Sequence, residues 1–175
     1  MKSANSFSDT VQVQGAIKIE VFDAKTGKFL YCATDKPNLV CINTRLALTN
    51  LLDQSGGNLD YERIWSIYVG DDNTPPTTVD TALIGANQFG KVVVQPVTII
   101  GLPTSGIIEV EMTLAAGDHN NQYLRECGLY TQGSAAGATV PPNVNAHMLA
   151  RQIHGEVYKT AGITVKYNWR YRIVA

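Results

Sequence analysis

The segment Ile163–Val174 (ITVKYNWRYRIV) decides how the chain folds. Its residues alternate between apolar or aromatic side chains and polar or cationic ones. Because successive side chains of a β-strand point to opposite faces, this alternation predicts a strand with one buried and one solvated face. The aromatic side chains are therefore expected in a core. Binding of single-stranded nucleic acid would need aromatic and cationic groups on the same face, and here the pleat separates them.

Working outward, the chain holds further short runs rich in Val, Ile, Thr, Tyr and Phe, separated by Gly, Pro, Asn and Asp. Such a pattern predicts a mainly β protein, an antiparallel β-sandwich. Asp23–Gly27 is expected to join the first two runs as a hairpin, and Asp35–Asn38 to close that unit. The runs are residues 15–22, 28–34, 64–69, 89–100, 107–114, 122–131 and 146–154.

One short helix is expected to pack on the sandwich. The residues of its apolar stripe fall at helical spacing, and they are Thr44, Ala47, Leu48, Leu51 and Leu52. A helix of about three turns is marginal alone in water, so it needs a sheet to pack against. Residues 15–175 are expected to form a single sandwich domain, and residues 1–14 a flexible arm that orders only on a partner.

Composition excludes several classes of function. The 175 residues contain 14 Lys and Arg against 15 Asp and Glu, a formal net charge of −1, so the bulk positive field of a nucleic-acid binder is missing. We expect no membrane insertion, because no apolar run approaches the roughly 20 residues that cross a bilayer. Residues 1–15 lack a Sec-type signal. Charged residues make up only 17%, below the usual quarter, which indicates that part of the surface meets protein.

No catalytic or cofactor motif is found: the sequence has no GxSxG, no GxxxxGK[ST] and no HExxH. We therefore expect no enzymatic activity, no cofactor and no metal. His147 and His154 are seven residues apart and would face opposite sides of a regular strand. Asp71–Asn73 is interpreted as a polar turn. Glu109 and Glu111 are interpreted as the solvated side of a strand.

The three cysteines, Cys32, Cys41 and Cys127, show no CxxC spacing, and they are expected to be reduced and mostly buried.

Two strands carry a different signal, because each of their faces mixes charged and apolar side chains. They are residues 123–130 (YLRECGLY) and 146–154 (AHMLARQIH). A strand without a wet face suits a position covered on both sides, and charges there need partners. Arg125, Glu126 and Arg151 are the candidates for fixed ion pairs, inside the subunit or across an assembly contact; a location near a sheet edge is the alternative.

From residue 38 onwards the order of motifs resembles that of small bacteriophage virion proteins of tails, baseplates and tail-collar fibres. The motifs are NTRLALTNLL (43–52), IYVGDDNTPPTTVDTALIG (67–85), RECGLY (125–130), LAR (149–151) and the closing pattern of residues 159–174. The sequence departs from the pattern in Cys127 where Ile is usual, in lacking an acidic residue after Leu83–Gly85, and in its hairpin of residues 15–34. These departures leave the position in the virion open.

This resemblance implies a β-rich structural module without enzymatic activity that repeats by symmetry and joins larger virion parts. The expected function is that of a phage tail, baseplate or fibre-attachment component, made in the bacterial cytoplasm and located in the virion. Its expected partners are copies of itself and other virion proteins, with no nucleic acid and no membrane. A host-surface, glycan-binding module is the alternative, in which Trp65 or Tyr130 would stack on sugar rings.

Overall fold

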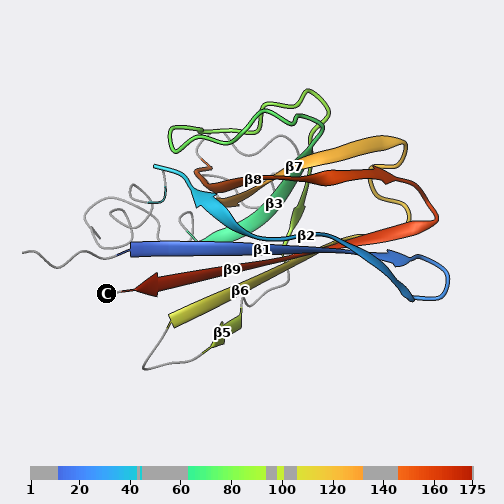
Figure 1. Cartoon of the computed structure of the whole chain (residues 1–175), viewed down its shortest axis with the longest axis horizontal. Coiled ribbons are helices and arrows are strands. Elements are labelled where there is room, and N and C mark those ends of the chain that lie inside the picture. Colours follow the sequence, from blue (N-terminus) through green and yellow to red (C-terminus); the bar gives the residue numbers. More distant parts are fainter. Residues whose placement is uncertain are drawn as a thin grey trace, which may run out of the picture.

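A computed structural model describes residues 12–42, 44, 63–93, 98–100, 106–131 and 146–174. Nine strands form within these residues (Figure 1). They are β1 (Gln12–Asp23), β2 (Phe29–Val40), β3 (Ile64–Gly70), β4 (Phe89–Val92), β5 (Thr98–Ile100), β6 (Gly106–Leu114), β7 (Gln122–Thr131), β8 (Met148–Lys159) and β9 (Ile163–Val174).

The strands pair in the continuous order β4-β3-β7-β8-β2-β1-β9-β6-β5, and every pair is antiparallel. Strand β2 belongs to two sheets, because it pairs with β1 over most of its length but with β8 only at Leu39 and Val40. The first sheet is therefore β2-β1-β9-β6-β5 and the second is β4-β3-β7-β8. The two sheets pack together, so the predicted antiparallel β-sandwich is confirmed. The predicted helix falls outside the described residues except for Thr44.

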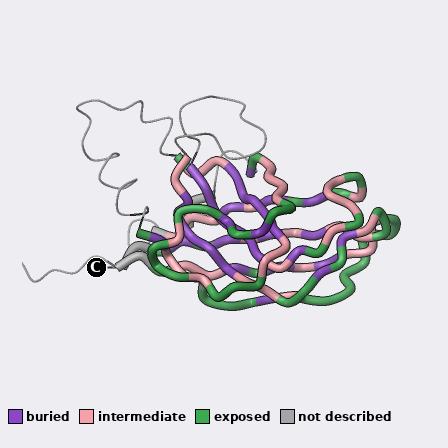
Figure 2. The backbone as a smooth tube through the Cα atoms, turned by 90° about the horizontal axis from the view of Figure 1, so that it is seen from above, coloured by how far each residue is buried: buried purple, intermediate pink, exposed green. Residues whose placement is uncertain are grey.

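The hydrophobic core lies between the two sheets, where buried residues run along the inside of the molecule (Figure 2). Tyr167 and Trp169 on β9 are fully buried, which confirms that the aromatic face of this strand belongs to the core. Alternation places each strand's apolar set toward the other sheet. The remaining core residues include Ile17, Ile19 and Val21 of β1, Val110, Met112 and Leu114 of β6, Ile67 and Val69 of β3, and Cys127 and Leu129 of β7.

The outer face of the first sheet is polar over much of its area. Glu111 pairs with Lys166 at 2.7 Å, and Glu109 pairs with Arg170 at 2.5 Å. Both carboxylates thus lie on the solvated face, as predicted, and each is matched to a cation of the neighbouring strand. Exposed pairs of this kind contribute little to stability, but they mark which face is wet.

Several predicted boundaries are wrong, two of them in the first hairpin. Strand β1 begins at Gln12 instead of residue 15, because β9 continues to Val174 and offers it ladder partners; residues 1–11 of the predicted arm lie outside the described residues. The predicted turn at Asp35–Asn38 is part of β2. Pro37 is tolerated there because β2 is paired with β8 only beyond it, so a missing N–H on that side breaks no ladder bond.

The predicted single strand of residues 89–100 is two strands, β4 and β5, which belong to different sheets. Strand β8 extends to Lys159, five residues beyond its predicted end, since Tyr158 and Lys159 still pair with the beginning of β7.

Candidate functional site

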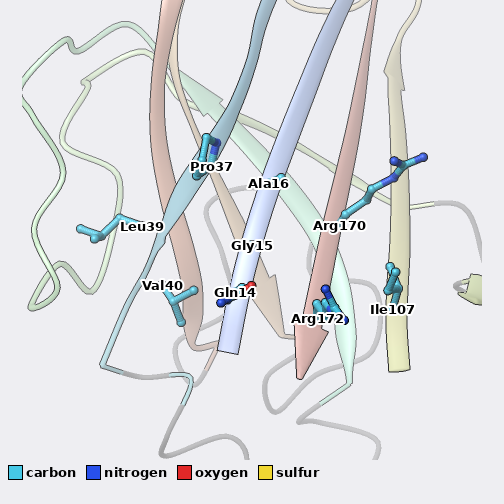
Figure 3. A pocket seen from close by; sticks show the side chains of 9 residues that line it. All are labelled: Gln14, Gly15, Ala16, Pro37, Leu39, Val40, Ile107, Arg170 and Arg172. Atoms are coloured by element: carbon cyan, nitrogen blue, oxygen red, sulfur yellow. The ribbon is translucent and has the colours of Figure 1, made fainter. Parts of the chain in front are cut away.

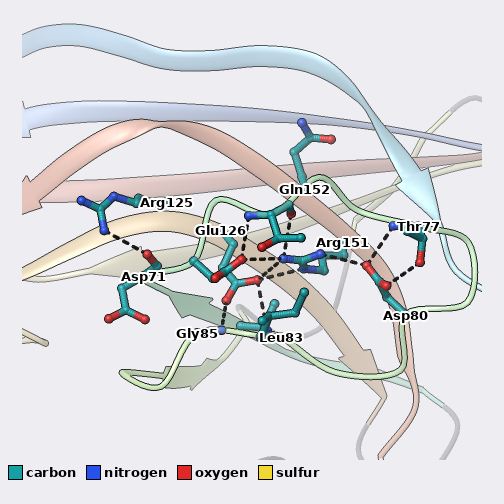
Figure 4. Close-up of polar contacts among 12 residues, drawn as sticks. Asp71, Thr77, Asp80, Leu83, Gly85, Arg125, Glu126, Arg151 and Gln152 are labelled. Carbon is teal, nitrogen blue, oxygen red and sulfur yellow. Dashed lines mark hydrogen bonds and ion pairs between the residues drawn. The ribbon is translucent and has the colours of Figure 1, made fainter.

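A loop of residues 71–88 connects β3 to β4 and lies on the outer face of the second sheet (Figure 4). We call it the covering loop. Its backbone is shaped by short side chains that accept hydrogen bonds from nearby residues, as turn-forming Asp residues do. Asp72 Oδ1 accepts from the Thr74 N–H at 2.6 Å, and Asp80 accepts from the N–H and hydroxyl of Thr77 at 2.9 and 2.5 Å. The interpretation of residues 71–73 as a polar turn agrees with the first of these contacts.

Beneath the covering loop lies a buried ion pair between Glu126 of β7 and Arg151 of β8, both 0% exposed. Glu126 Oε2 lies 2.8 Å from both Nε and Nη2 of Arg151, so two guanidinium nitrogens contact the same carboxylate oxygen. The opposite side of the guanidinium reaches the loop, with Nη1 donating to Asp80 Oδ2 at 2.9 Å and Nη2 lying 3.6 Å from Asp72 Oδ1. One arginine therefore joins the sheet to the loop through three carboxylates.

The surroundings of Arg151 and Asp80 favour the charged form of each side chain. Burial disfavours the charge on Arg151, but Asp80 and Glu126 outweigh it and raise the pKa of the guanidinium. Burial likewise opposes ionisation of Asp80, yet the hydrogen bonds of Thr77 and the Arg151 guanidinium lower the pKa of that carboxyl. We infer that Arg151 and Asp80 stay ionised at neutral pH.

Glu126 also binds the loop backbone directly. Its Oε1 accepts a hydrogen bond from the Gly85 N–H at 2.6 Å, and its Oε2 lies 3.4 Å from the Ile84 N–H. Gly85 is required by this close approach, because a Cβ there would lie 2.7 Å from the backbone nitrogen of Asp71 and 2.8 Å from Glu126 Oε1. The carboxylate thus holds the loop at a point where only glycine fits.

An apolar cluster lies beside the ion pair under the same loop. Leu83 enters it from the loop, and its N–H donates to the Tyr130 hydroxyl at 3.0 Å. Tyr68 packs edge-on against Tyr130, with ring centroids 5.2 Å apart. Tyr130 is 1% exposed, so the prediction that it could stack on a sugar is wrong: it lies on the face that the loop covers. Trp65 is half-buried, with the Arg63 guanidinium 4.5 Å from its ring centre.

Arg125 lies apart from the buried pair and closer to solvent. Its Nε and Nη2 contact Glu156 Oε2 of β8 at 2.7 and 2.6 Å, and its Nη1 donates to the Asp71 carbonyl at 3.1 Å. The guanidinium also lies 4.7 Å from the ring centre of Tyr123. The structure therefore places all three candidate residues in ion pairs within the chain, but only Glu126 and Arg151 share one.

Sequence reasoning missed Asp72, Asp80 and Glu156, the carboxylates that complete these pairs. Asp80 lies 71 positions before Arg151 in the sequence, so no local spacing of residues predicts the contact. The only signal in the sequence was the presence of charges on strands without a wet face, which requires opposite charges from elsewhere in the chain.

Within the part of the chain that the structure describes, no group of three or more His, Cys, Asp or Glu is arranged to hold a metal ion. The same residues contain no helix long and apolar enough to span a membrane.

Comparisons of the chain with protein-family models, curated proteins and solved structures give no match.

Proposed function

We propose that the protein is a bacteriophage virion structural subunit, a tail, baseplate or fibre-attachment component that assembles with copies of itself and with other virion proteins. On this proposal it has no enzymatic activity. It is made in the bacterial host's cytoplasm and functions in the virion.

One observation carries the proposal. Three of the five motifs on which the phage resemblance rests are far apart in sequence, yet they meet in one cluster. RECGLY supplies Glu126 and Tyr130, LAR supplies Arg151, and the DDNTPPTTVDTALIG stretch (residues 71–85) forms most of the covering loop that these side chains hold. Contact among these motifs supports the resemblance, because motifs that matched by chance composition alone would not be expected to contact one another in the fold.

The same cluster supports an architectural role over a catalytic one. Glu126 and Arg151 are the most deeply buried charged side chains of this cluster, and their polar atoms are directed at the chain's own loop. A catalytic carboxylate has to reach a substrate, whereas these groups fix one surface segment. A rigid subunit with its charges satisfied internally is suited to repeated docking.

Exposed apolar side chains supply surface for such docking. Phe29, Leu30 and Tyr31 follow one another on β2 and are each between 44 and 48% exposed. Because neighbouring residues of a strand point to opposite faces, exposure of all three means that both faces of β2 are open to solvent beside the first hairpin turn. Large apolar residues grouped on a surface are typical of protein contacts.

The deciding experiment is to locate the protein in purified phage particles. Quantitative mass spectrometry gives its copy number, and an image reconstruction of the particle gives its position. We expect a fixed copy number set by tail or baseplate symmetry. Particles that lack the protein, together with a purified chain that stays monomeric, would contradict the proposal.

A second candidate function, binding of host-surface glycans, is favoured by one observation. Tyr123 and Tyr158 lie on neighbouring strands with ring centroids 4.9 Å apart, and they are 43 and 47% exposed. The adjacent Arg125–Glu156 pair offers donors and acceptors for hydroxyl groups. A glycan array with the isolated protein tests this candidate. Signal that is lost in Tyr158→Ala but kept in Tyr31→Ala would favour glycan binding over a purely architectural role.

A further inference from the structure

We propose that a groove on the outer face of the first sheet binds a segment of a neighbouring protein in which a carboxylate lies next to an apolar side chain. The groove has a volume of about 690 Å³ and lies where β2, β1, β9 and β6 run side by side (Figure 3). This inference rests on the proposed function only for the existence of a neighbour; the chemistry of that neighbour follows from the groove.

The strand register explains why a hollow forms here. Residues directly opposite on antiparallel strands share a face, so the outer face can be followed row by row. A charged row comes first: Asp35, Lys18, Asn168 and Glu111. The next row is Pro37, Ala16, Arg170 and Glu109, and the row beyond it is Gln14, Arg172 and Ile107. Ala16 is a small residue between longer neighbours, and the sheet is therefore hollowed at its position.

The lining of the groove is mainly apolar. Ala16, Pro37, Val40 and Ile107 contribute side chains without polar atoms, in contrast to the charged row beside them. Water in contact with such a concave apolar surface is displaced favourably by an apolar side chain of a partner. One part of the occupant is therefore aliphatic or aromatic.

The charge at the rim determines the other part. Three cations of this sheet face already have carboxylate partners within the chain: Lys18 with Glu20, Lys166 with Glu111, and Arg170 with Glu109. Among the described residues, Arg172 has no carboxylate within ion-pair distance. An arginine fork matches a carboxylate with two parallel hydrogen bonds. The complementary group is thus a single carboxylate positioned beside the apolar side chain.

Nucleic acid is a poorer match for the same groove. Binding of a phosphate backbone needs several free cations along its path, because each phosphate contact neutralises one charge. Here Glu109 neutralises Arg170, and the whole chain carries a formal net charge of −1. A protein segment with one acidic residue needs only Arg172.

Peptide titrations of the full-length, ¹⁵N-labelled protein test the inference without any phage particle. The probe is the capped pentapeptide Gly-Leu-Asp-Leu-Gly, and its matched control has Asn in place of Asp. We expect amide shifts at Ala16, Ile107 and Arg172 with a Kd of about 1 mM or tighter, and at least about tenfold weaker binding of the Asn peptide. Arg172→Gln should abolish the preference for Asp, and Ala16→Phe should weaken both peptides by filling the groove. Lys28→Gln, which removes an exposed cation from the first hairpin, should change neither.

Three results would overturn the inference: no shift at the groove with the Asp peptide, equal binding of both peptides, or an unchanged preference in Arg172→Gln. A short single-stranded DNA that displaces the Asp peptide would also overturn it, in favour of a phosphate site. These titrations use the isolated chain, so a negative result would contradict the groove proposal but not the virion proposal. Conversely, absence of the protein from phage particles would contradict the virion proposal but not a measured affinity for the peptide.

Discussion

Removal of Arg151 is the most informative perturbation of this fold. In Arg151→Met the aliphatic stem is roughly preserved, but the guanidinium that joins Glu126 to Asp80 is lost. Glu126 is 0% exposed and would keep only its contacts with the loop N–H groups of Gly85 and Ile84. Breaking a buried pair by removing one partner costs about 3–5 kcal/mol, because it leaves an uncompensated charge in the interior. Small domains have about 5–15 kcal/mol in total, so this variant should unfold at much lower denaturant concentration.

The double variant Glu126→Gln/Arg151→Met separates loss of the pair from burial of the leftover charge. We expect it to be more stable than Arg151→Met by about 2 kcal/mol or more, because the introduced glutamine is neutral and its side-chain oxygen can still accept from the Gly85 N–H. Urea unfolding followed by circular dichroism measures each free energy. Arg125→Met is the matched control: its pair with Glu156 is partly exposed, so the loss should be about 1 kcal/mol or less. Equal losses in Arg125→Met and Arg151→Met would refute the reasoning.

Three further outcomes follow from single side chains. Burial lowers the pKa of His154 from an ordinary 6.5 to about 4. The neutral imidazole therefore costs the fold nothing above pH 6.5, and the free energy of unfolding should fall by no more than about 3 kcal/mol as the pH drops from 6.5 toward 4. In melting experiments at different pH values, this fall should be smaller in His154→Phe. Cys32 is exposed whereas burial raises the pKa of Cys41 to about 11, so one thiol per native chain should react rapidly with a disulfide reagent, and a second fast thiol would contradict the packing. Gly85→Ala should lose about 1–3 kcal/mol because its Cβ would crowd the loop backbone, while Gly117→Ala, which has open space around it, should be nearly neutral in the same assay.

The sequence predicts the sandwich well, because its strands are specified by local alternation. Residues 163–173 alternate without interruption, and the predicted bounds of this strand and its buried face match the structure. The composition of Asp35–Asn38 predicts a turn, because Asp, Pro and Asn are common in turns, but an open edge on β2 lets Pro37 remain in the strand. Here the position of the strand in the sheet overrides local propensity.

The buried cluster could be predicted only in part, for a different physical reason. Mixed charge on two strands indicated that Glu126 and Arg151 needed partners, yet it did not identify Asp80, which comes from a loop with no periodic pattern. A contact between residues so distant in the chain depends on how the covering loop closes over the sheet. That closure is decided by the whole set of contacts and leaves no signal in spacing.

The two outer faces of the sandwich differ in what covers them, and this difference bears on the proposed assembly. The second sheet is covered by its own chain, and the Arg151 cluster fixes that cover, so a partner cannot pair with this face without displacing a loop held by buried charges. The first sheet instead has a groove on its outer face, with an apolar lining and Arg172 at its rim. If the subunit docks through a sheet face, the first sheet is therefore the one it uses. The Phe29–Tyr31 segment of β2 adds exposed apolar side chains to the same sheet.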